Sequence, residues 1–362
     1  MFSRALTILL LSAASIAVSA QLPRGFLRGG DVSEIPEVEA TGGHYSYQGK
    51  TEDPFRILKK AGWNWVRFRI WNHPKDGFCD KEHTLAAAKR AKAAGLAISL
   101  DFHYSDWWAD PGKQYAPAAW KELPMDKLTE AVYDYTKDVV DAMNRQGTRP
   151  NMVQIGNEIT AGMIWPQGKL ASNDPAQWKN LAALIDAGIR AVHDADGNRH
   201  RILTMIHLDR GGDNKGARWW FDHLKAEGVD FDTIGLSFYP FWHGTLTDLQ
   251  ANVNDLAVRY GKDIYVVETA YPWTIDRARG QGFAMTEKLD PEYPPTPEGQ
   301  AKFLRKMLEI VQAIPGGRGK GLLYWAPTWI STKTHIPWSN MATFNDQGEA
   351  LPGVRALGGK KD

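Results

Sequence analysis

Met152-Val153-Gln154-Ile155-Gly156-Asn157-Glu158 is a short apolar run that ends in a glutamate. A second run, Ile264-Tyr265-Val266-Val267-Glu268, ends in the same way. Each run has the length and composition of a buried strand, and each glutamate stands where that strand gives way to a loop. Because a carboxylate is rarely left at such a place unless it is paired or used, both glutamates are candidates for a functional site.

Further apolar runs bring the number of expected strands to eight. They lie near 26–27, 65–70, 97–102, 202–206, 233–237 and 321–325. Helical patterns separate them, at 53–61, 83–94, 125–146, 177–195, 218–227, 246–260 and 297–314. This alternation predicts an α/β fold with a parallel sheet, and eight strands favour a closed (β/α)8 (TIM) barrel. The chain has no sequence repeat, low-complexity tract or linker, so we expect a single catalytic domain over residues 21–362.

Residues 1–20 have the pattern of a signal peptide. Arg4 precedes an apolar run over 5–18, and Val18-Ser19-Ala20 supplies small residues for cleavage. The run is short for a membrane anchor, and no later segment has the length and hydropathy of a span. We therefore expect an exported protein, either periplasmic or secreted.

The charge balance argues against several kinds of partner. Lys and Arg number 43 and Asp and Glu number 42, and loss of residues 1–20 removes only Arg4 from the basic side. Such a balance, without a basic run, indicates neither nucleic acid nor an anionic membrane as a partner. Cys79 is the only cysteine, so no intrachain disulfide forms and stability must come from a large core. We expect a monomer.

The segments that follow the expected strands are long and aromatic, whereas those that precede them are short. In a barrel of this kind the loops after the strands form the active face. The chain has 15 tryptophans. Many of them stand in or beside these loops, where stacking against sugar rings is their simplest common role. They are Trp107, Trp108, Trp120, Trp165, Trp242, Trp273, Trp325 and Trp329.

The spacing of the two glutamates has a geometric meaning. Three βα units separate Glu158 from Glu268, which places them on opposite sides of the barrel mouth. Two carboxylates at one rim are the minimal equipment for cleaving a glycosidic bond. The alternative is that each glutamate forms a structural ion pair with an arginine at the rim.

Two polar residues adjoin these glutamates. Asn157 directly precedes Glu158, and its amide could hydrogen-bond a sugar hydroxyl beside the scissile bond or merely form a turn. Tyr239 follows the run at 233–237. Its hydroxyl could hold the Glu268 carboxylate in orientation and charge.

Two arginines alternate on one expected strand. Arg67 and Arg69 lie on the same strand face, and a buried arginine needs a carboxylate partner. We expect Arg69 to pair with Glu268 and keep it ionised as a nucleophile. The alternative partners of Arg69 are Asp31 and Asp101.

The stretch Asp101-Phe102-His103-Tyr104-Ser105-Asp106 raises a metal hypothesis, because Asp and His at a strand end can bind a divalent cation. No second histidine stands at a fixed spacing, so we assign no metal and no required cofactor. A hydrogen bond from His103 to substrate is favoured instead. The chain also lacks a Gly-x-Ser-x-Gly elbow and a GxGxxG after a strand, which argues against acyl transfer and dinucleotide binding.

Several longer motifs are more specific. They are Arg28-Gly29-Gly30-Asp31-Val32-Ser33, Val66-Arg67-Phe68-Arg69-Ile70-Trp71, Phe102-His103-Tyr104-Ser105-Asp106, Trp108-Ala109-Asp110-Pro111-Gly112-Lys113-Gln114, Gln154-Ile155-Gly156-Asn157-Glu158, Leu236-Ser237-Phe238-Tyr239-Pro240-Phe241-Trp242-His243-Gly244 and Val267-Glu268-Thr269-Ala270-Tyr271-Pro272-Trp273. In these motifs, from about residue 25 to 350, the chain resembles glycoside hydrolase family 53, the arabinogalactan endo-β-1,4-galactanases, a group of retaining (β/α)8 glycosidases.

This resemblance implies roles for several of the motif residues. Glu158 would be the general acid/base and Glu268 the nucleophile. The remaining motif residues would bind substrate or support the two glutamates: Asp31, Arg69, His103, Asp106, Trp108, Asn157, Tyr239, His243 and Trp273, with Trp325 after the last strand.

The chain departs from the family at two places. The family usually has Tyr-Trp-Glu-Pro after the last strand, where this chain has Tyr324-Trp325-Ala326-Pro327. Some bacterial members hold a structural calcium ion in the last loops, but Asn340, Asn345 and Asp346 do not form a matching ligand set here.

The sequence thus predicts an endo-acting retaining hydrolase of β-1,4-galactosidic bonds in galactan or arabinogalactan side chains of pectin. Three alternatives stay open. The first is a retaining β-glycanase for another polysaccharide, such as mannan or xylan. The others are a non-catalytic carbohydrate-binding barrel and a metal-dependent hydrolase in which the glutamates are structural.

Overall fold

A computed structural model describes residues 25–360, apart from residues 76, 173, 198, 277–287 and 334–336. The expected signal peptide at 1–20 lies outside the described residues. Within these residues, no helix combines the length and the apolar character that crossing a membrane requires.

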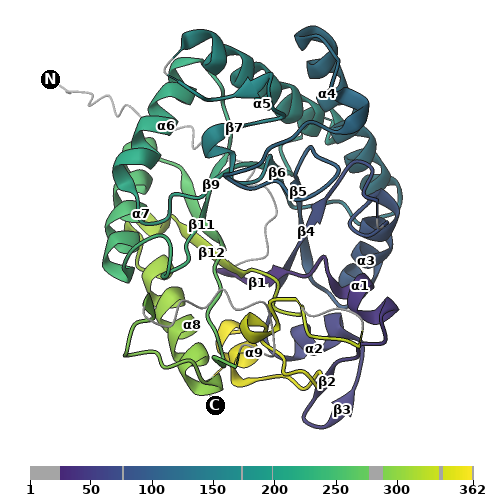
Figure 1. Cartoon of the computed structure of the whole chain (residues 1–362), viewed down its shortest axis with the longest axis vertical. Coiled ribbons are helices and arrows are strands. Elements are labelled where there is room, and N and C mark those ends of the chain that lie inside the picture. The colour runs from purple at the N-terminus through teal and green to yellow at the C-terminus, as the bar shows by residue number, and fades with distance from the viewer. Residues whose placement is uncertain are drawn as a thin grey trace, which may run out of the picture.

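Eight parallel strands close into a barrel, as predicted (Figure 1). The circle closes because the first strand pairs with both the second and the last barrel strand. The strands are β1 (Leu27–Asp31), β4 (Trp65–Ile70), β5 (Ala97–Phe102), β6 (Met152–Ile155), β9 (Leu203–Leu208), β10 (Thr233–Ser237), β11 (Asp263–Glu268) and β12 (Gly319–Tyr324).

A ring of helices surrounds the barrel (Figure 1). Its members are α2 (Pro54–Lys60), α3 (Lys81–Ala93), α4 (Met125–Arg145), α5 (Pro175–Ala195), α6 (Asn214–Ala226), α7 (Leu246–Tyr260) and α8 (Pro297–Gln312). Helix α7 illustrates how the sequence sets their ends. Thr245 and Asp248 form a capping box at its start, and Gly261 ends it in the left-handed conformation (φ 61°).

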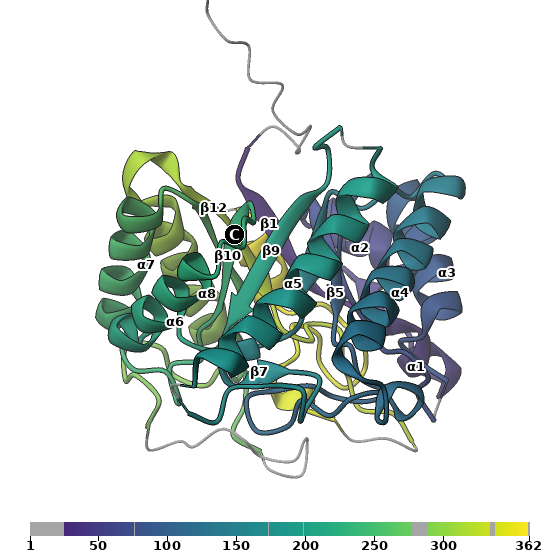
Figure 2. The same cartoon turned by 90° about the horizontal axis from the view of Figure 1, so that it is seen from above.

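Several short strands and helices lie outside the barrel and its ring of helices. Two hairpins, β2–β3 (Ser46–Tyr47 and Lys50–Thr51) and β7–β8 (Gly162–Met163 and Gly168–Lys169), project from loops that follow strands. Helices α1 (Ile35–Ala40) and α9 (Pro352–Leu357) come near the two ends of the described chain. Figure 2 shows the loops that follow the strands gathered at one end of the barrel, with β7 among them. This end is the one that the sequence predicted as the active face.

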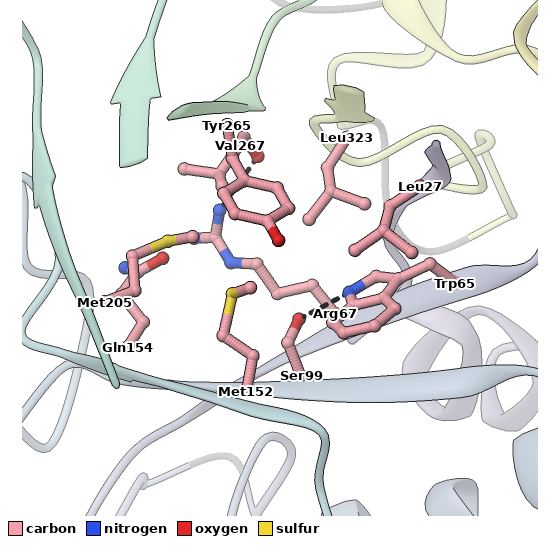
Figure 3. Close-up of a pocket in the computed structure, with 10 residues that line it drawn as sticks. All are labelled: Leu27, Trp65, Arg67, Ser99, Met152, Gln154, Met205, Tyr265, Val267 and Leu323. Carbon is pink, nitrogen blue, oxygen red and sulfur yellow. Dashed lines mark hydrogen bonds between the residues drawn. The ribbon is translucent and has the colours of Figure 1, made fainter. Parts of the chain in front are cut away.

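A layer of apolar side chains fills the inside of the barrel below that face (Figure 3). It consists of Leu27, Trp65, Met152, Met205, Tyr265, Val267 and Leu323. A cavity of only about 10 Å³ remains among them. The Arg67 side chain crosses this layer, and its Nη1 donates a hydrogen bond of 3.0 Å to the Val267 carbonyl. The layer is therefore a packed floor for the polar groups above it.

Candidate active site

Glu158 and Glu268 lie at the carboxyl ends of β6 and β11, as predicted, and line one cleft of about 540 Å³. Gly156 makes the turn after β6 possible, because a Cβ at this position (φ 80°) would stand 2.5 Å from Ile159 Cγ2. Glu158 itself adopts a left-handed backbone, with φ 48° and ψ 49°. Such a conformation is unusual for a residue with a side chain, and it aims this carboxyl group into the cleft.

The two carboxyl groups are close neighbours. An oxygen of each lies within 4.8 Å of an oxygen of the other. Retaining glycosidases hold their two carboxyl groups about 5–5.5 Å apart, whereas inverting enzymes need about 6.5–9.5 Å to admit a water between them. The spacing fits a double displacement.

Arg67, and not Arg69, is the partner of Glu268. Arg67 Nη2 lies 2.7 Å from Glu268 Oε1. Arg69 pairs instead with Asp31 at 3.0 Å and stands 3.6 Å from Glu34. The expected Arg69–Glu268 pair is therefore wrong, and the alternative partner Asp31 is confirmed.

The register of the barrel explains this exchange. Tyr324 on β12 stands level with Val66 on β4, through the strand pairs that each makes with β1. Glu268 stands level with Tyr324, because the residues two positions earlier on β11 and β12 are paired. Arg67 follows Val66 directly in this register and reaches Glu268, while Arg69 lies two residues closer to the mouth. Strand periodicity predicts which face a residue takes but not this height.

Asp101 and His103 lie beneath the carboxyl pair. Although burial alone would raise it, the neighbouring Arg67 guanidinium lowers the pKa of Asp101 to about 2. His103 Nε2 stands 3.1 Å from Asp101, and His103 Nδ1 accepts hydrogen bonds of 3.1 Å from Trp71 Nε1 and the Ala109 amide. Because protein groups occupy both ring nitrogens, His103 does not fit the expected role of a donor to substrate. It holds Asp101 and the loop that contains Ala109 instead.

The surroundings of the two glutamates separate their protonation states. Burial, followed by the negative charge of Glu268, raises the pKa of Glu158 well above its usual value. Burial also raises the pKa of Glu268, but Arg67 opposes that rise. Tyr239 Oη donates a hydrogen bond of 3.1 Å to Glu268 Oε2, which confirms the expected contact. A proton shared by this pair therefore resides on Glu158, and the charge resides on Glu268.

Two buried residues that the sequence analysis missed connect the pair. Ser237 Oγ lies 2.6 Å from Glu158 Oε1 and 3.4 Å from Glu268 Oε2, within hydrogen-bond reach of both. His207 Nε2 lies 2.8 Å from Ser237 Oγ. Both are polar residues inside otherwise apolar strands, and that is the signal by which they could have been found.

Asn157 lines the cleft but is held by the protein. Its Nδ2 donates to the Ala109 carbonyl at 2.9 Å, and its Oδ1 lies 3.2 Å from Arg67 Nη2 and 3.0 Å from His207 Nδ1. These contacts fix the amide beside Glu158.

Aromatic side chains form two walls of the cleft. One wall consists of Trp108, Trp325 and Trp329, whose rings lie 4.4, 5.5 and 5.9 Å from the Arg69 guanidinium. The other contains Trp242 and Trp338, with ring centres 5.9 Å apart. Arg69 therefore supports a wall rather than the nucleophile.

The wall that contains Trp325 and Trp329 is anchored to the first βα unit. Thr328, between these tryptophans in sequence, donates from its amide to Glu34 Oε1 at 3.2 Å. The Thr328 carbonyl accepts a hydrogen bond of 2.7 Å from Tyr45 Oη. Burial, against the opposing effect of Arg69, raises the pKa of Glu34 to about 7.

The remaining expected site residues take different places. His243 lines the cleft, and its Nδ1 accepts a hydrogen bond of 3.2 Å from the Tyr239 amide. Asp106 accepts from the amides of His73 at 3.0 Å and Ala118 at 2.8 Å, so it joins two loops. Trp273 is not among the residues that line the cleft, and its Nε1 donates to the Ser339 carbonyl at 2.9 Å.

Comparison with known proteins identifies the family to which this barrel belongs. The family model described as glycosyl hydrolase family 53 matches residues 27–357. The chain belongs to this family.

Individual relatives and a solved structure are similar to this chain over most of its length. An arabinogalactan endo-β-1,4-galactanase of Cellvibrio japonicus is 37% identical over 340 residues, which cover 92% of this chain and 88% of the relative. An uncharacterized protein of Niallia circulans is 45% identical over 344 residues, covering 92% of this chain and 93% of that protein. The solved catalytic domain of the Ignisphaera aggregans family 53 protein superposes with a TM-score of 0.85 at 38% identity, covering 93% of this chain and 96% of that chain.

Ala326 marks the departure of this family 53 chain after β12. Its backbone is left-handed (φ 48°), and it is buried. Both neighbouring side chains approach the barrel: Trp325 lines the cleft, and Pro327 Cγ would lie 2.8 Å from a Cβ on Gly30. Ala326 itself supplies no carboxylate at this position.

Asn345, one of the residues considered as a calcium ligand, is engaged in a local turn. Asn345 Oδ1 accepts hydrogen bonds from the Gln347 and Glu349 amides at 3.0 and 2.9 Å, which is a turn rather than a ligand set. In the part of the chain that the structure describes, one trio of His, Cys, Asp or Glu side chains is close enough to share an ion, and it is Glu158, His207 and Glu268.

Proposed function

We propose that this protein is an endo-acting β-1,4-galactanase that cleaves galactan or arabinogalactan side chains of pectin with retention of configuration. The observation that carries this proposal is the pair of carboxyl groups, with oxygens within 4.8 Å of each other. The pair lies in a cleft of a family 53 chain whose C. japonicus relative is named an arabinogalactan endo-β-1,4-galactanase.

In the first step, neutral Glu158 gives its proton to the glycosidic oxygen while Glu268 attacks the anomeric carbon. The bond from that carbon to the leaving oxygen breaks, and an ester bond to Glu268 forms. Arg67 and Tyr239 support this step, because they hold the ionised Glu268 before it attacks.

In the second step, ionised Glu158 takes a proton from a water molecule as that water attacks the anomeric carbon. The ester bond to Glu268 breaks, and the sugar leaves with its original configuration. Asn157 stands beside Glu158 in the cleft, and its Nδ2 carries a second N–H, besides the one bonded to the Ala109 carbonyl, for a sugar hydroxyl.

The two tryptophan walls would hold the polysaccharide on either side of the carboxyl pair. Tryptophan faces suit the flat apolar faces of galactose units, and the polar groups between the walls suit the hydroxyl groups. We also infer export, on the pattern of residues 1–20, and action as a monomer without a required metal.

Product analysis tests this function. The protein is incubated with linear β-1,4-galactan, β-1,3-galactan, xylan and mannan, with and without a chelator. We expect short galacto-oligosaccharides from β-1,4-galactan alone, undiminished by the chelator, and none from Glu268→Ala of unchanged fold. Release from xylan or mannan would make the protein a different β-glycanase. Binding without release would make it a carbohydrate-binding barrel, and loss of activity with the chelator would point to a metal-dependent hydrolase.

A further inference from the structure

The proposed mechanism asks Glu158 to change its protonation state within each cycle. It must be neutral when the free enzyme attacks and ionised when water arrives, while the charge on Glu268 disappears into the ester bond. The negative charge of the site therefore moves from Glu268 to Glu158 and back. A hydrogen-bond donor that could turn toward whichever glutamate is ionised would lower the barrier of both chemical steps.

Ser237 is placed between the two ends of this movement. Its Oγ lies 2.6 Å from Glu158 Oε1 and 3.4 Å from Glu268 Oε2. It stands at the end of β10 and is fully buried, so solvent does not compete for its hydroxyl. A hydroxyl carries one proton, and Ser237 can donate to only one carboxylate at a time.

His207 leaves the proton of that hydroxyl available for a carboxylate. Two N–H groups face His207 Nδ1: Gln154 Nε2 at 3.1 Å and the Glu158 amide at 3.4 Å. The nearby Asn157 Oδ1, 3.0 Å from Nδ1, has two lone pairs, and these face the donors Arg67 Nη2 and Gln154 Nε2, each at 3.2 Å. We therefore assign Nδ1 as the acceptor and the ring proton to Nε2. Burial, followed by Arg67, lowers the pKa of His207 and keeps the ring neutral. His207 Nε2 then donates to Ser237 Oγ at 2.8 Å, and the hydroxyl proton is left for a carboxylate.

The two carboxyl groups depend on Ser237 unequally. Glu268 also accepts from Arg67 at 2.7 Å and Tyr239 at 3.1 Å. For Glu158, Ser237 is the one side-chain donor found among the described residues. Removal of the hydroxyl should therefore affect Glu158 when it is ionised far more than it affects Glu268.

We propose that Ser237 is a positioning residue whose hydroxyl proton turns toward Glu268 in the free enzyme and toward Glu158 in the glycosyl-enzyme. This inference rests on the proposed function. No proton is transferred from Ser237: the hydroxyl only rotates, while Glu158 loses and regains its own proton. Ser237 thereby favours the base form of Glu158 in the second step without weakening its acid form in the first.

The test compares two substrates of one sugar. With a dinitrophenyl β-galactobioside the departure of the aryl group is fast, so hydrolysis of the glycosyl-enzyme limits the rate. With a phenyl β-galactobioside, formation of the glycosyl-enzyme limits the rate. For Ser237→Ala we expect a turnover about 10- to 100-fold lower on the first substrate, the effect of one hydrogen bond to a charged group, and within about threefold of wild type on the second. The glycosyl-enzyme should accumulate and be visible by mass spectrometry.

A pH profile and two further variants complete the test. Loss of the donor raises the pKa of Glu158 in the glycosyl-enzyme, so the acid limb of dinitrophenyl substrate turnover should move to higher pH. Ser237→Cys, of similar size and with a weak donor, should lie between wild type and Ser237→Ala. Ser99→Ala removes another hydroxyl inside the barrel, one that accepts from Trp65 Nε1 at 3.0 Å, and should leave the ratio of the two rates unchanged.

The outcomes separate this inference from the function beneath it. If wild type releases aryl groups and cleaves galactan, but Ser237→Ala and Ser237→Cys slow both substrates equally and leave the acid limb in place, the role assigned to Ser237 is wrong and the function stands. If wild type turns over neither galactan nor an aryl galactobioside, both proposals fail.

Discussion

Arg67 and Glu268 form an ion pair inside the barrel, with 2.7 Å between Arg67 Nη2 and Glu268 Oε1 and both side chains almost fully buried. The same guanidinium contacts Asp101 and lies 3.3 Å from Asp31. One arginine thus holds several carboxylates at once. A planar group with five donors suits this task, and an ammonium group does not.

The first expectation follows from this geometry. Arg67→Lys keeps the charge but loses the fork of donors, so kcat/KM on galactan should fall at least about 100-fold. Arg69, on the same strand, supports the tryptophan wall instead. We therefore expect the fold-decrease in kcat/KM for Arg69→Lys to be less than a tenth of that for Arg67→Lys. Thermal unfolding checks that both variants fold. An Arg67→Lys enzyme with more than half the wild-type activity would contradict the role given to this pair.

Glu158→Ala should separate the two chemical roles. A dinitrophenyl galactoside needs little help from an acid, so the glycosyl-enzyme still forms, but no base activates water and turnover should fall on the order of 10³-fold. Azide needs no base and should restore turnover, yielding the β-galactosyl azide. In Glu268→Ala the azide should attack from the other face and yield the α-azide. The reverse pattern of products would exchange the two assignments.

Trp242 and Trp219 form a matched pair for testing the cleft walls. Their exposed fractions are 42% and 40%, but Trp242 lines the cleft and Trp219 lies on the outer helix α6. Loss of one stacking contact is worth about 0.5–1.5 kcal/mol. Trp242→Ala should therefore raise KM for galactan about 2- to 10-fold, whereas Trp219→Ala should leave it unchanged. Equal effects would remove the argument for a sugar-binding wall.

Glu34 should make stability depend on pH. Its pKa rises from the ordinary 4.5 to about 7 in the folded protein, with burial as the main cause. The folded state then binds more protons than the unfolded state between these values, so stability falls as the pH rises from about 4.5 to 7. Glu34→Gln removes this loss. We expect it to be more stable than wild type at pH 8, on the order of 2 kcal/mol, and similar at pH 4.

Urea unfolding at the two pH values measures this difference. Glu37→Gln, on the same helix α1, controls for the loss of a carboxylate near Arg69. If Glu34→Gln and wild type keep the same difference in stability at pH 4 and pH 8, Glu34 does not titrate in this range.

The fold was predictable because the strands and helices have distinct periods. The expected runs at 65–70, 97–102, 152–155 and 233–237 coincide with strands of the barrel. Strand β1 (Leu27–Asp31) extends beyond the apolar run at 26–27 that indicates it, because Gly29 and Gly30 have a low strand propensity. The structure shows why they are there: a Cβ on Gly29 would stand 1.9 Å from the Trp65 carbonyl oxygen.

The positions of the two glutamates were predictable, but the residues that contact them were less so. Glu158 and Glu268 stand at strand ends, where a pattern reveals them. The choice between Arg67 and Arg69 depends on the stagger of strands around the barrel, which a single strand does not encode. Ser237 acts through a partner on a different strand, and no local spacing links it to Glu158.

The anchor of the tryptophan wall bears on how the chain becomes active. Glu34 and Tyr45 reach Thr328 across 294 and 283 residues of sequence. Contacts between such distant segments must await the closing of a very long loop, so they form late in folding. A chain still emerging from the ribosome therefore has both glutamates well before it has the wall around Trp325 and Trp329. The complete binding cleft for a polysaccharide therefore forms only after the last barrel strand has paired with the first.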